Sequence, residues 1–179
     1  MRLTYWTFSD IFSENYFPSK PFHGGFGLLS LHGIAKPAYQ AFSLLHSLGT
    51  EHAEVEGMHP NVKTWVSRSG DDWIVLATNH APPRRPIRSE NVRVTLTHAM
   101  PVRGAFIARI DENHTNPRAA WEKMGSPTYP TNDELEALQG AATLERTHHD
   151  VHYEDGRVDL EFDLPPHGVA AITLETAAA

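Results

Sequence analysis

Short runs that alternate hydrophobic and polar residues fill most of the chain after residue 60, and this pattern constrains the fold most strongly. Every second residue from Val158 to Leu164 is hydrophobic, as in a strand with one buried face. The pair Asp155-Gly156 stands just before this run and predicts a two-residue hairpin. About seven such strands, separated by turn residues, favour a two-sheet β-sandwich over residues 58–176.

Three helices are predicted outside this strand pattern. Hydrophobic residues recur on one face from residue 37 to 48, Pro37 suits the first turn, and Gly49 suits a left-handed residue that ends the helix. Two shorter helices are expected as insertions in the sandwich. One follows the pair Asn116-Pro117, and the other follows the capping box that begins at Thr131. The polar stretch between residues 50 and 60 indicates a linker.

The composition excludes several classes of function. The chain of 179 residues has no cysteine, so disulfides, thiolate metal sites and cysteine nucleophiles are excluded. Its net charge of −7 argues against nucleic acid or anionic membrane surfaces as partners. No apolar run has the roughly 18 residues that a membrane span needs. The first residues lack the features of a secretory signal, so we expect a cytoplasmic protein.

Three motifs lie close together in the first fifty residues. The chain reads YWTFSD over residues 5–10, FHGGFGLL over residues 22–29 and KPAY over residues 36–39. This stretch resembles the end of the catalytic barrel of glycoside hydrolase family 39, the family of β-xylosidases and α-L-iduronidases. The segments 109–117 and 164–169 are similar to the C-terminal β-domain of that family. The resemblance implies a mainly β chain, in which residues 1–50 hold the last βα unit of a (β/α)8 barrel and residues 58–176 form an accessory sandwich.

The resemblance also implies a reaction, the retaining hydrolysis of terminal β-xylosyl residues. Retaining glycosidases use two carboxyl groups, one as acid/base and one as nucleophile. In the family these glutamates end the fourth and seventh barrel strands, the first of them within an Asn-Glu-Pro motif. The chain contains no Asn-Glu pair. We therefore expect no catalytic residue in it, no activity of the chain alone, and a second polypeptide chain as a possible source of the missing strands. We expect residues 1–50 to be mobile, packed on the sandwich or engaged with that second chain.

The family resemblance assigns sugar contacts to the first segment. It places Trp6 in the floor of the sugar subsite and Glu14 beside the sugar hydroxyls, and His23 is a further candidate for contact with a xylo-oligosaccharide. An indole stacks on the apolar face of a pyranose, and a carboxylate accepts hydrogen bonds from hydroxyls. The structural alternatives are a core role for Trp6, a solvated Glu14 and a structural loop histidine at His23. Asp10 is expected to cap a turn, and the Trp6–Thr7 peptide bond is expected to be trans in the isolated chain.

Two other kinds of site have to be weighed. His148, Asp150 and His152 would share one face of a single strand and could bind zinc or nickel, although no zinc-protease spacing is present. We predict neither a physiological metal nor a cofactor. The alternative function is a non-catalytic carbohydrate-binding or interaction sandwich, with Trp65 as the exposed aromatic and with Trp73 and Trp121 in the core.

Overall fold

The computed structural model describes residues 4–11 and 20–176, which group into two compact units. The unit that we call the helical unit comprises the described residues up to Ser43, together with residues 112–144. The unit that we call the sandwich unit comprises residues 44–111 and 145–176. These divisions differ from the expected boundaries, because the two short helices group with the N-terminal segment.

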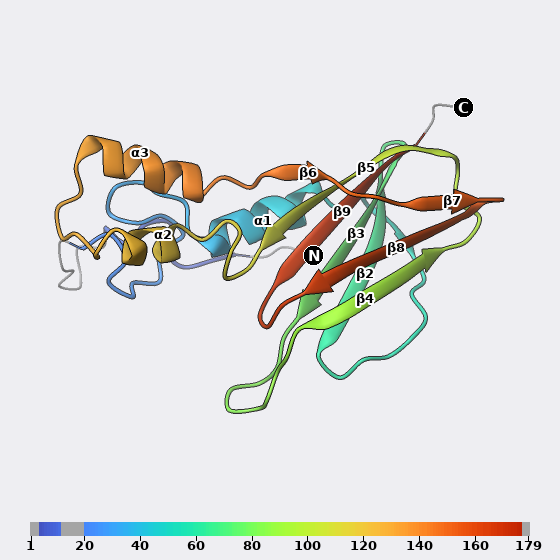
Figure 1. Ribbon diagram of the computed structural model, residues 1–179, viewed down its shortest axis with the longest axis horizontal. Coiled ribbons are helices and arrows are strands. Elements are labelled where there is room, and N and C mark those ends of the chain that lie inside the picture. Colours follow the sequence, from blue (N-terminus) through green and yellow to red (C-terminus); the bar gives the residue numbers. More distant parts are fainter. Residues whose placement is uncertain (1–3, 12–19, 177–179) are drawn as a thin grey trace. The chain divides into compact units, whose positions relative to one another are not determined.

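The sandwich unit consists of two antiparallel sheets (Figure 1). The six-stranded sheet has the order β1-β2-β3-β9-β5-β6, and the three-stranded sheet has the order β4-β8-β7. The described strands are β1 (Glu51–Ala53), β2 (Val62–Ser69), β3 (Asp72–Asn79), β4 (Glu90–Leu96), β5 (Val102–Ile110), β6 (Arg146–His148), β7 (His152–Glu154), β8 (Arg157–Leu164) and β9 (Val169–Thr176). The predicted mainly β fold with a sandwich is confirmed.

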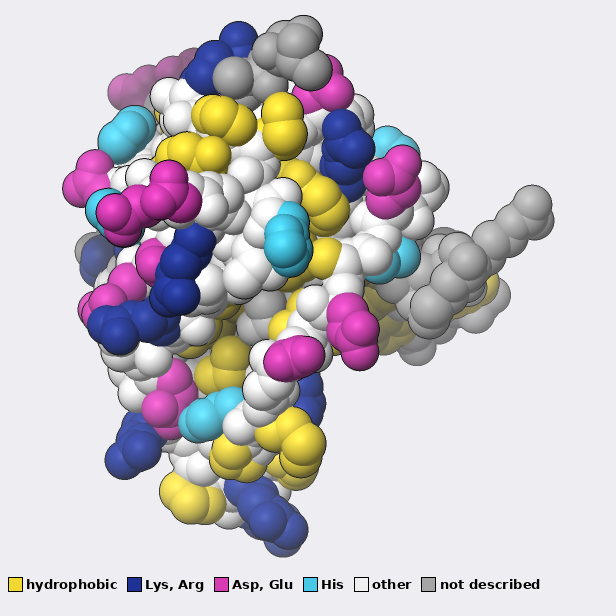
Figure 2. All heavy atoms as spheres, turned by 90° about the vertical axis from the view of Figure 1, so that its right-hand side faces the viewer, with side chains coloured by type: hydrophobic (Ala, Val, Ile, Leu, Met, Phe, Trp, Pro, Cys, Tyr) yellow, Lys and Arg dark blue, Asp and Glu magenta, His cyan; other side chains and the backbone are white. Residues whose placement is uncertain are grey.

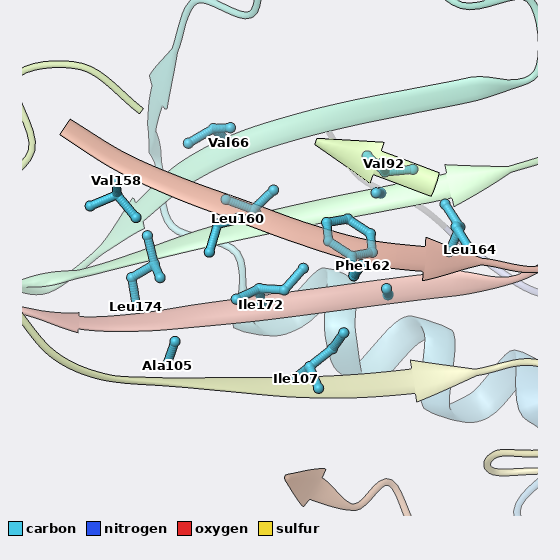
Figure 3. Packing of buried hydrophobic residues seen from close by; sticks show 13 residues of the cluster. Val66, Val92, Ala105, Ile107, Val158, Leu160, Phe162, Leu164, Ile172 and Leu174 are labelled. Atoms are coloured by element: carbon cyan, nitrogen blue, oxygen red, sulfur yellow. The ribbon is translucent and has the colours of Figure 1, made fainter. Parts of the chain in front are cut away.

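The core of the sandwich unit lies between these two sheets. The alternating residues of β8 point inward, and Val158, Leu160, Phe162 and Leu164 are at most 3% exposed. They pack against residues of the larger sheet, among them Ile107 on β5 and Ile172 on β9 (Figure 3). The burial of this hydrophobic face drives the packing of the two sheets, because each sheet removes apolar surface from contact with water.

The hairpin between β7 and β8 forms at the predicted position. Glu154 pairs with Arg157, so Asp155 and Gly156 form the two-residue loop. Both loop residues have positive φ angles, 46° for Asp155 and 80° for Gly156. This is the geometry of a type I′ turn, which Asp-Gly favours because these residues tolerate the left-handed region.

The helical unit contains the two short helices, α2 and α3, and the first part of the longer helix α1. α2 (Pro117–Lys123) begins at the N-cap Asn116, and α3 (Asn132–Ala141) begins with a full capping box between Thr131 and Glu134. α1 (Pro37–Ser47) ends two residues before Gly49. The three predicted helices and the two predicted N-caps are therefore confirmed.

A small hydrophobic core joins the N-terminal segment to α2 and α3. It consists of Phe22, Ile34, Trp121, Leu138 and Ala142. Trp121 is 7% exposed, and its indole N–H donates a hydrogen bond to the carbonyl of Pro127 at 2.9 Å. The described part of the N-terminal segment thus packs on the two helices, an arrangement that the sequence did not predict.

Two local predictions need correction. Gly49 does not have a positive φ angle; a Cβ at this position would instead overlap the carbonyl of Arg68 on β2. Glycine is required there because the backbone passes close to the sheet, not because it ends the helix in a left-handed conformation. The expected linker of residues 50–60 contains β1, which pairs with the C-terminal half of β2.

The described helices are all too short or too polar to cross a membrane.

Candidate functional site

The candidate site is built around Asp10, whose side chain is completely buried in the helical unit. Asp10 Oδ1 accepts hydrogen bonds from the backbone N–H of Gly27 at 2.8 Å and from Lys36 Nζ at 2.7 Å. Lys36 Nζ also lies 2.6 Å from Asp10 Oδ2 and donates to the carbonyl of Gly25 at 2.8 Å. Asp10 therefore holds the glycine-rich loop, as its predicted role at a turn implies. We call Asp10, Lys36 and their bonds to the loop the Asp10 tie.

A tight turn after the loop brings Lys36 to this position. Leu28 and Lys36 are joined by a backbone hydrogen bond, and the buried Ser30 accepts from the N–H groups of His32 and Ile34 through its hydroxyl. Sequence reasoning assigned Lys36 only to the start of a helix. One signal was available: Lys36 is the only Lys or Arg between Lys20 and Lys63, so the buried carboxylate of Asp10 has few possible cationic partners.

The glycines of the loop are required for two different reasons. Gly24 has a φ angle of 92°, which favours glycine. At Gly25 a Cβ would lie 2.6 Å from Asp10 Oδ1 and 2.7 Å from His23 Cε1, and at Gly27 it would overlap the backbone of Ser9 and Asp10. The loop is therefore pressed directly onto the end of the segment that carries Trp6.

The segment around Trp6 accepts backbone hydrogen bonds from the C-terminal end of the glycine-rich loop. Leu28 N–H donates to the carbonyl of Thr7 and Leu29 N–H donates to that of Phe8. The β-strand of the expected βα unit does not form over residues 5–10, where among the described residues Ser9 alone makes a β-bridge, to Leu29. A strand needs neighbours that continue the ladder, and the described part of the chain offers a single bridge. The Trp6–Thr7 peptide bond is cis, so the expected trans bond was wrong.

Several hydrophobic side chains of this segment are exposed. Trp6 is 70% exposed, so its alternative role as a core aromatic is wrong for the described structure. The other exposed residues of this group are Tyr5, Phe8, Ile11 and Phe26. Isolated exposed hydrophobic residues are common, but a group of this size typically marks a surface that another element covers.

The other two predicted site residues have different outcomes. His23 lies beside the Asp10 tie, with Nε2 3.7 Å from Asp10 Oδ2 and a side chain that is 11% exposed. His23 therefore lies next to Asp10 and Gly25. Glu14 lies outside the described residues, and its role stays a prediction.

The histidine cluster does not form a metal site in the described part of the chain. The run from His148 to His152 is not one strand, because β6 ends at His148 and β7 begins at His152 in the other sheet. The expectation that these side chains share one face was therefore wrong. Residues 4–11 and 20–176 contain no group of three or more histidine, aspartate or glutamate side chains that could hold a metal ion.

His149 lies between these two strands and is partly buried. Its ring is 6.3 Å from that of Phe162, edge to face, and its backbone N–H donates to the carbonyl of Ala105. Burial lowers the pKa of His149, and the positive charge of Arg109 lowers it further. The imidazole is therefore favoured in its neutral form.

A hollow with a volume of about 880 Å³ lies in the sandwich unit. It is lined by residues 53–59, by β4 and by part of β2, with Trp73 at its wall. Figure 2 views the molecule from this side, and hydrophobic side chains are visible among acidic, basic and histidine side chains. Trp65 is 48% exposed, as predicted, but it does not line the hollow; Trp73 is half-buried against the core.

Comparison with known proteins identifies the family. The sequence model of "Glycosyl hydrolases family 39" matches residues 2–158. A β-xylosidase of Caldicellulosiruptor saccharolyticus is 39% identical over 96% of this chain, and one of Geobacillus stearothermophilus is 31% identical over 96%. The chain spans only 36% and 33% of the lengths of these two relatives.

Solved structures agree with these relatives. A family 39 enzyme of Xanthomonas axonopodis pv. citri matches 97% of the chain with a TM-score of 0.76 and 25% identity, over 37% of its own length. A monomeric β-xylosidase of Caulobacter crescentus CB15 matches 98% of the chain with a TM-score of 0.72 and 26% identity, over 38% of its own length. Because the family model covers most of the chain, and relatives and structures agree with it, this chain belongs to glycosyl hydrolase family 39.

Proposed function

We propose that this chain provides one wall of the sugar pocket of a retaining β-xylosidase and closes its catalytic barrel. In this proposal Trp6 stacks on the xylosyl ring, and Glu14 and His23 bind its hydroxyls. The acid/base and nucleophile glutamates belong to barrel strands outside this sequence, so the chain alone does not hydrolyse a glycoside. The relatives named β-xylosidase support xylose as the sugar.

The observation that carries the proposal is the exposure of Trp6 on a backbone that is firmly held. The indole is 70% exposed, while the neighbouring Thr7 and Phe8 carbonyls are hydrogen-bonded to the loop. An exposed aromatic ring on a held backbone suits stacking on a sugar, because the backbone loses little freedom when the ligand binds. The exposed Tyr5, Phe8 and Ile11 suit packing against further barrel strands.

A complementation experiment tests this proposal. The chain is mixed with the part of the Caldicellulosiruptor saccharolyticus relative that precedes the matched region, and the rate of hydrolysis of a chromogenic β-xyloside is measured. Activity that appears only on mixing supports the proposal. Hydrolysis by the chain alone would contradict the absence of the catalytic pair.

The second candidate function is a carbohydrate-binding module without catalysis. The exposed Trp65 and the hollow beside residues 53–59 are the observations that favour it. Titration of the chain alone with xylo-oligosaccharides separates the two candidates. Binding that is lost in Trp65→Ala and kept in Trp6→Ala would favour the module.

A further inference from the structure

We propose that Asp10 is a positioning residue, which fixes the ring of His23 so that Nδ1 accepts a hydrogen bond from a sugar hydroxyl. This inference deepens the proposed function and rests on it. Asp10 itself is fully buried and does not contact the sugar.

The orientation of the ring follows from which nitrogen is buried. His23 Nε2 is buried without a hydrogen-bond partner among the described residues, and it lies 3.7 Å from Asp10 Oδ2. A carboxylate accepts hydrogen bonds and donates none, so the nitrogen that faces it is favoured as N–H. In the neutral ring Nδ1 is then the unprotonated nitrogen, which can accept a hydrogen bond but cannot donate one.

The glycine-rich loop contacts the ring beside Asp10. A Cβ at Gly25 would lie 2.7 Å from His23 Cε1, so glycine is needed for the ring to lie against the loop. The ring therefore packs on Gly25 beside the Asp10 carboxylate. A residue with a side chain at position 25 would displace the ring, the carboxylate, or both.

Lys36 keeps the carboxylate in place. Its ammonium lies 2.7 Å from Oδ1 and 2.6 Å from Oδ2 of Asp10 and donates to the carbonyl of Gly25. The cation thus neutralises the buried carboxylate and attaches it to the loop that confines His23. Without Lys36 the carboxylate would be a buried charge with little compensation.

The consequence concerns the sugar that the pocket accepts. A neutral histidine with a proton on Nε2 requires a donor from its ligand, and each sugar hydroxyl can supply one. An analogue with a hydrogen or fluorine in place of that hydroxyl loses this hydrogen bond. The Asp10 tie thereby contributes to specificity without touching the substrate.

The first test is spectroscopic and uses the chain alone. Two-bond ¹H–¹⁵N spectra of the labelled protein, above the ordinary histidine pKa, distinguish the two neutral forms of each ring. We expect His23 to be fully in the Nε2–H form, and the exposed His32 to show a mixture as an internal reference. In Asp10→Asn the His23 signals should move toward those of His32. A His23 spectrum that already matches that of His32 in the unsubstituted chain would overturn the inference.

The second test uses the mixture with the barrel portion of the relative. If Asp10 acts through His23, then Asp10→Asn should lower kcat/KM about 10-fold in the unsubstituted chain and have little further effect in His23→Gln. Equal losses in both backgrounds would overturn the inference. Lys36→Arg should retain most of the activity that Lys36→Met loses. A mixture that is inactive even without substitutions contradicts the proposed function instead, and the spectra still decide the orientation of His23.

Discussion

Phe22 and Trp121 pack ring against ring, with centroids 5.8 Å apart and planes inclined by 57°. They come from segments far apart in the sequence, the start of the glycine-rich loop and helix α2. Their contact places the loop of the candidate site on a core that α2 and α3 complete. The two short helices therefore stabilise the loop of the candidate site, although the sequence predicted them as insertions in the sandwich.

The first prediction concerns this contact. Trp121→Ala should destabilise the helical unit by about 3–5 kcal/mol, because it removes a buried aromatic side chain and leaves a cavity. Hydrogen exchange should become faster in α3 and in residues 21–36, while β8 keeps its protection. The matched control is Trp65→Ala, which removes an exposed indole and should change exchange little. Unchanged exchange in α3 of the Trp121 variant would contradict the described core.

Much of this architecture could be predicted from the sequence, and the reasons are local. The hairpin at Asp155-Gly156, the capping box at Thr131 and the N-cap at Asn116 depend on neighbouring residues alone, so their sequence signals were sufficient. The alternation along β8 reflects a single buried face, and it correctly identified the sandwich core.

The predictions that failed depend on contacts between distant residues. Gly49 is glycine because of Arg68, and Lys36 is essential to the loop because of Asp10; neither relationship leaves a periodic signal in the sequence. β1 is a three-residue edge strand without alternating burial, so it was mistaken for a linker. In the candidate site, the resemblance indicated Trp6 and Glu14, and His23 was a candidate because it stands beside two glycines. The Asp10 tie between the segments of Trp6 and His23 required the structure.

The second prediction concerns the Asp10 tie. Lys36→Met should destabilise the helical unit by about 3–5 kcal/mol, because it leaves the buried carboxylate of Asp10 unpaired. Lys36→Arg keeps the charge and should cost less. The exchange rate of the Gly27 amide, which donates to Asp10, is the direct measurement. Equal protection of this amide in both variants would show that the ion pair does not hold the loop.

The third prediction compares two glycines. Gly49→Ala should be strongly destabilising, because its Cβ would overlap the Arg68 carbonyl. Gly140→Ala should stabilise α3 by about 0.5–1 kcal/mol, because this helical position is open and alanine is the better helix former. Thermal unfolding of both variants checks the pair. A Gly49 variant as stable as the unsubstituted chain would contradict the close approach to β2.

The fourth prediction concerns pH. The pKa of His149 in the folded sandwich lies below its ordinary value of 6.5, mainly because the ring is buried. On acidification the unfolded chain therefore binds this proton first, so the His149 contribution to stability is complete above about pH 6.5 and decreases as the pH falls toward the folded pKa. His149→Leu should flatten the pH dependence of the unfolding midpoint in this range. An identical pH dependence in the variant would contradict the assignment.

A separate group acts at lower pH. Arg157 and Thr95 lower the pKa of Asp159 to about 2 through hydrogen bonds to its carboxylate. The folded state therefore keeps this carboxylate ionised when a free aspartate, with a pKa of 3.8, would be protonated. Its contribution to stability is complete above about pH 4 and is lost progressively as the pH falls from there to about 2. Asp159→Asn should leave the pH dependence near His149 unchanged, which separates the two effects.

The most direct test of the central claim compares Trp6→Ala with Trp65→Ala in the mixture with the barrel portion of the relative. Both substitutions remove an exposed indole, from the helical unit and from the sandwich unit respectively. If Trp6 forms the wall of the sugar pocket, its loss should lower kcat/KM for an aryl β-xyloside at least about 10-fold, or ~1.4 kcal/mol, and the loss of Trp65 should not. Equal activity of the two variants, at or near that of the unsubstituted mixture, would contradict the assignment of the pocket to this chain.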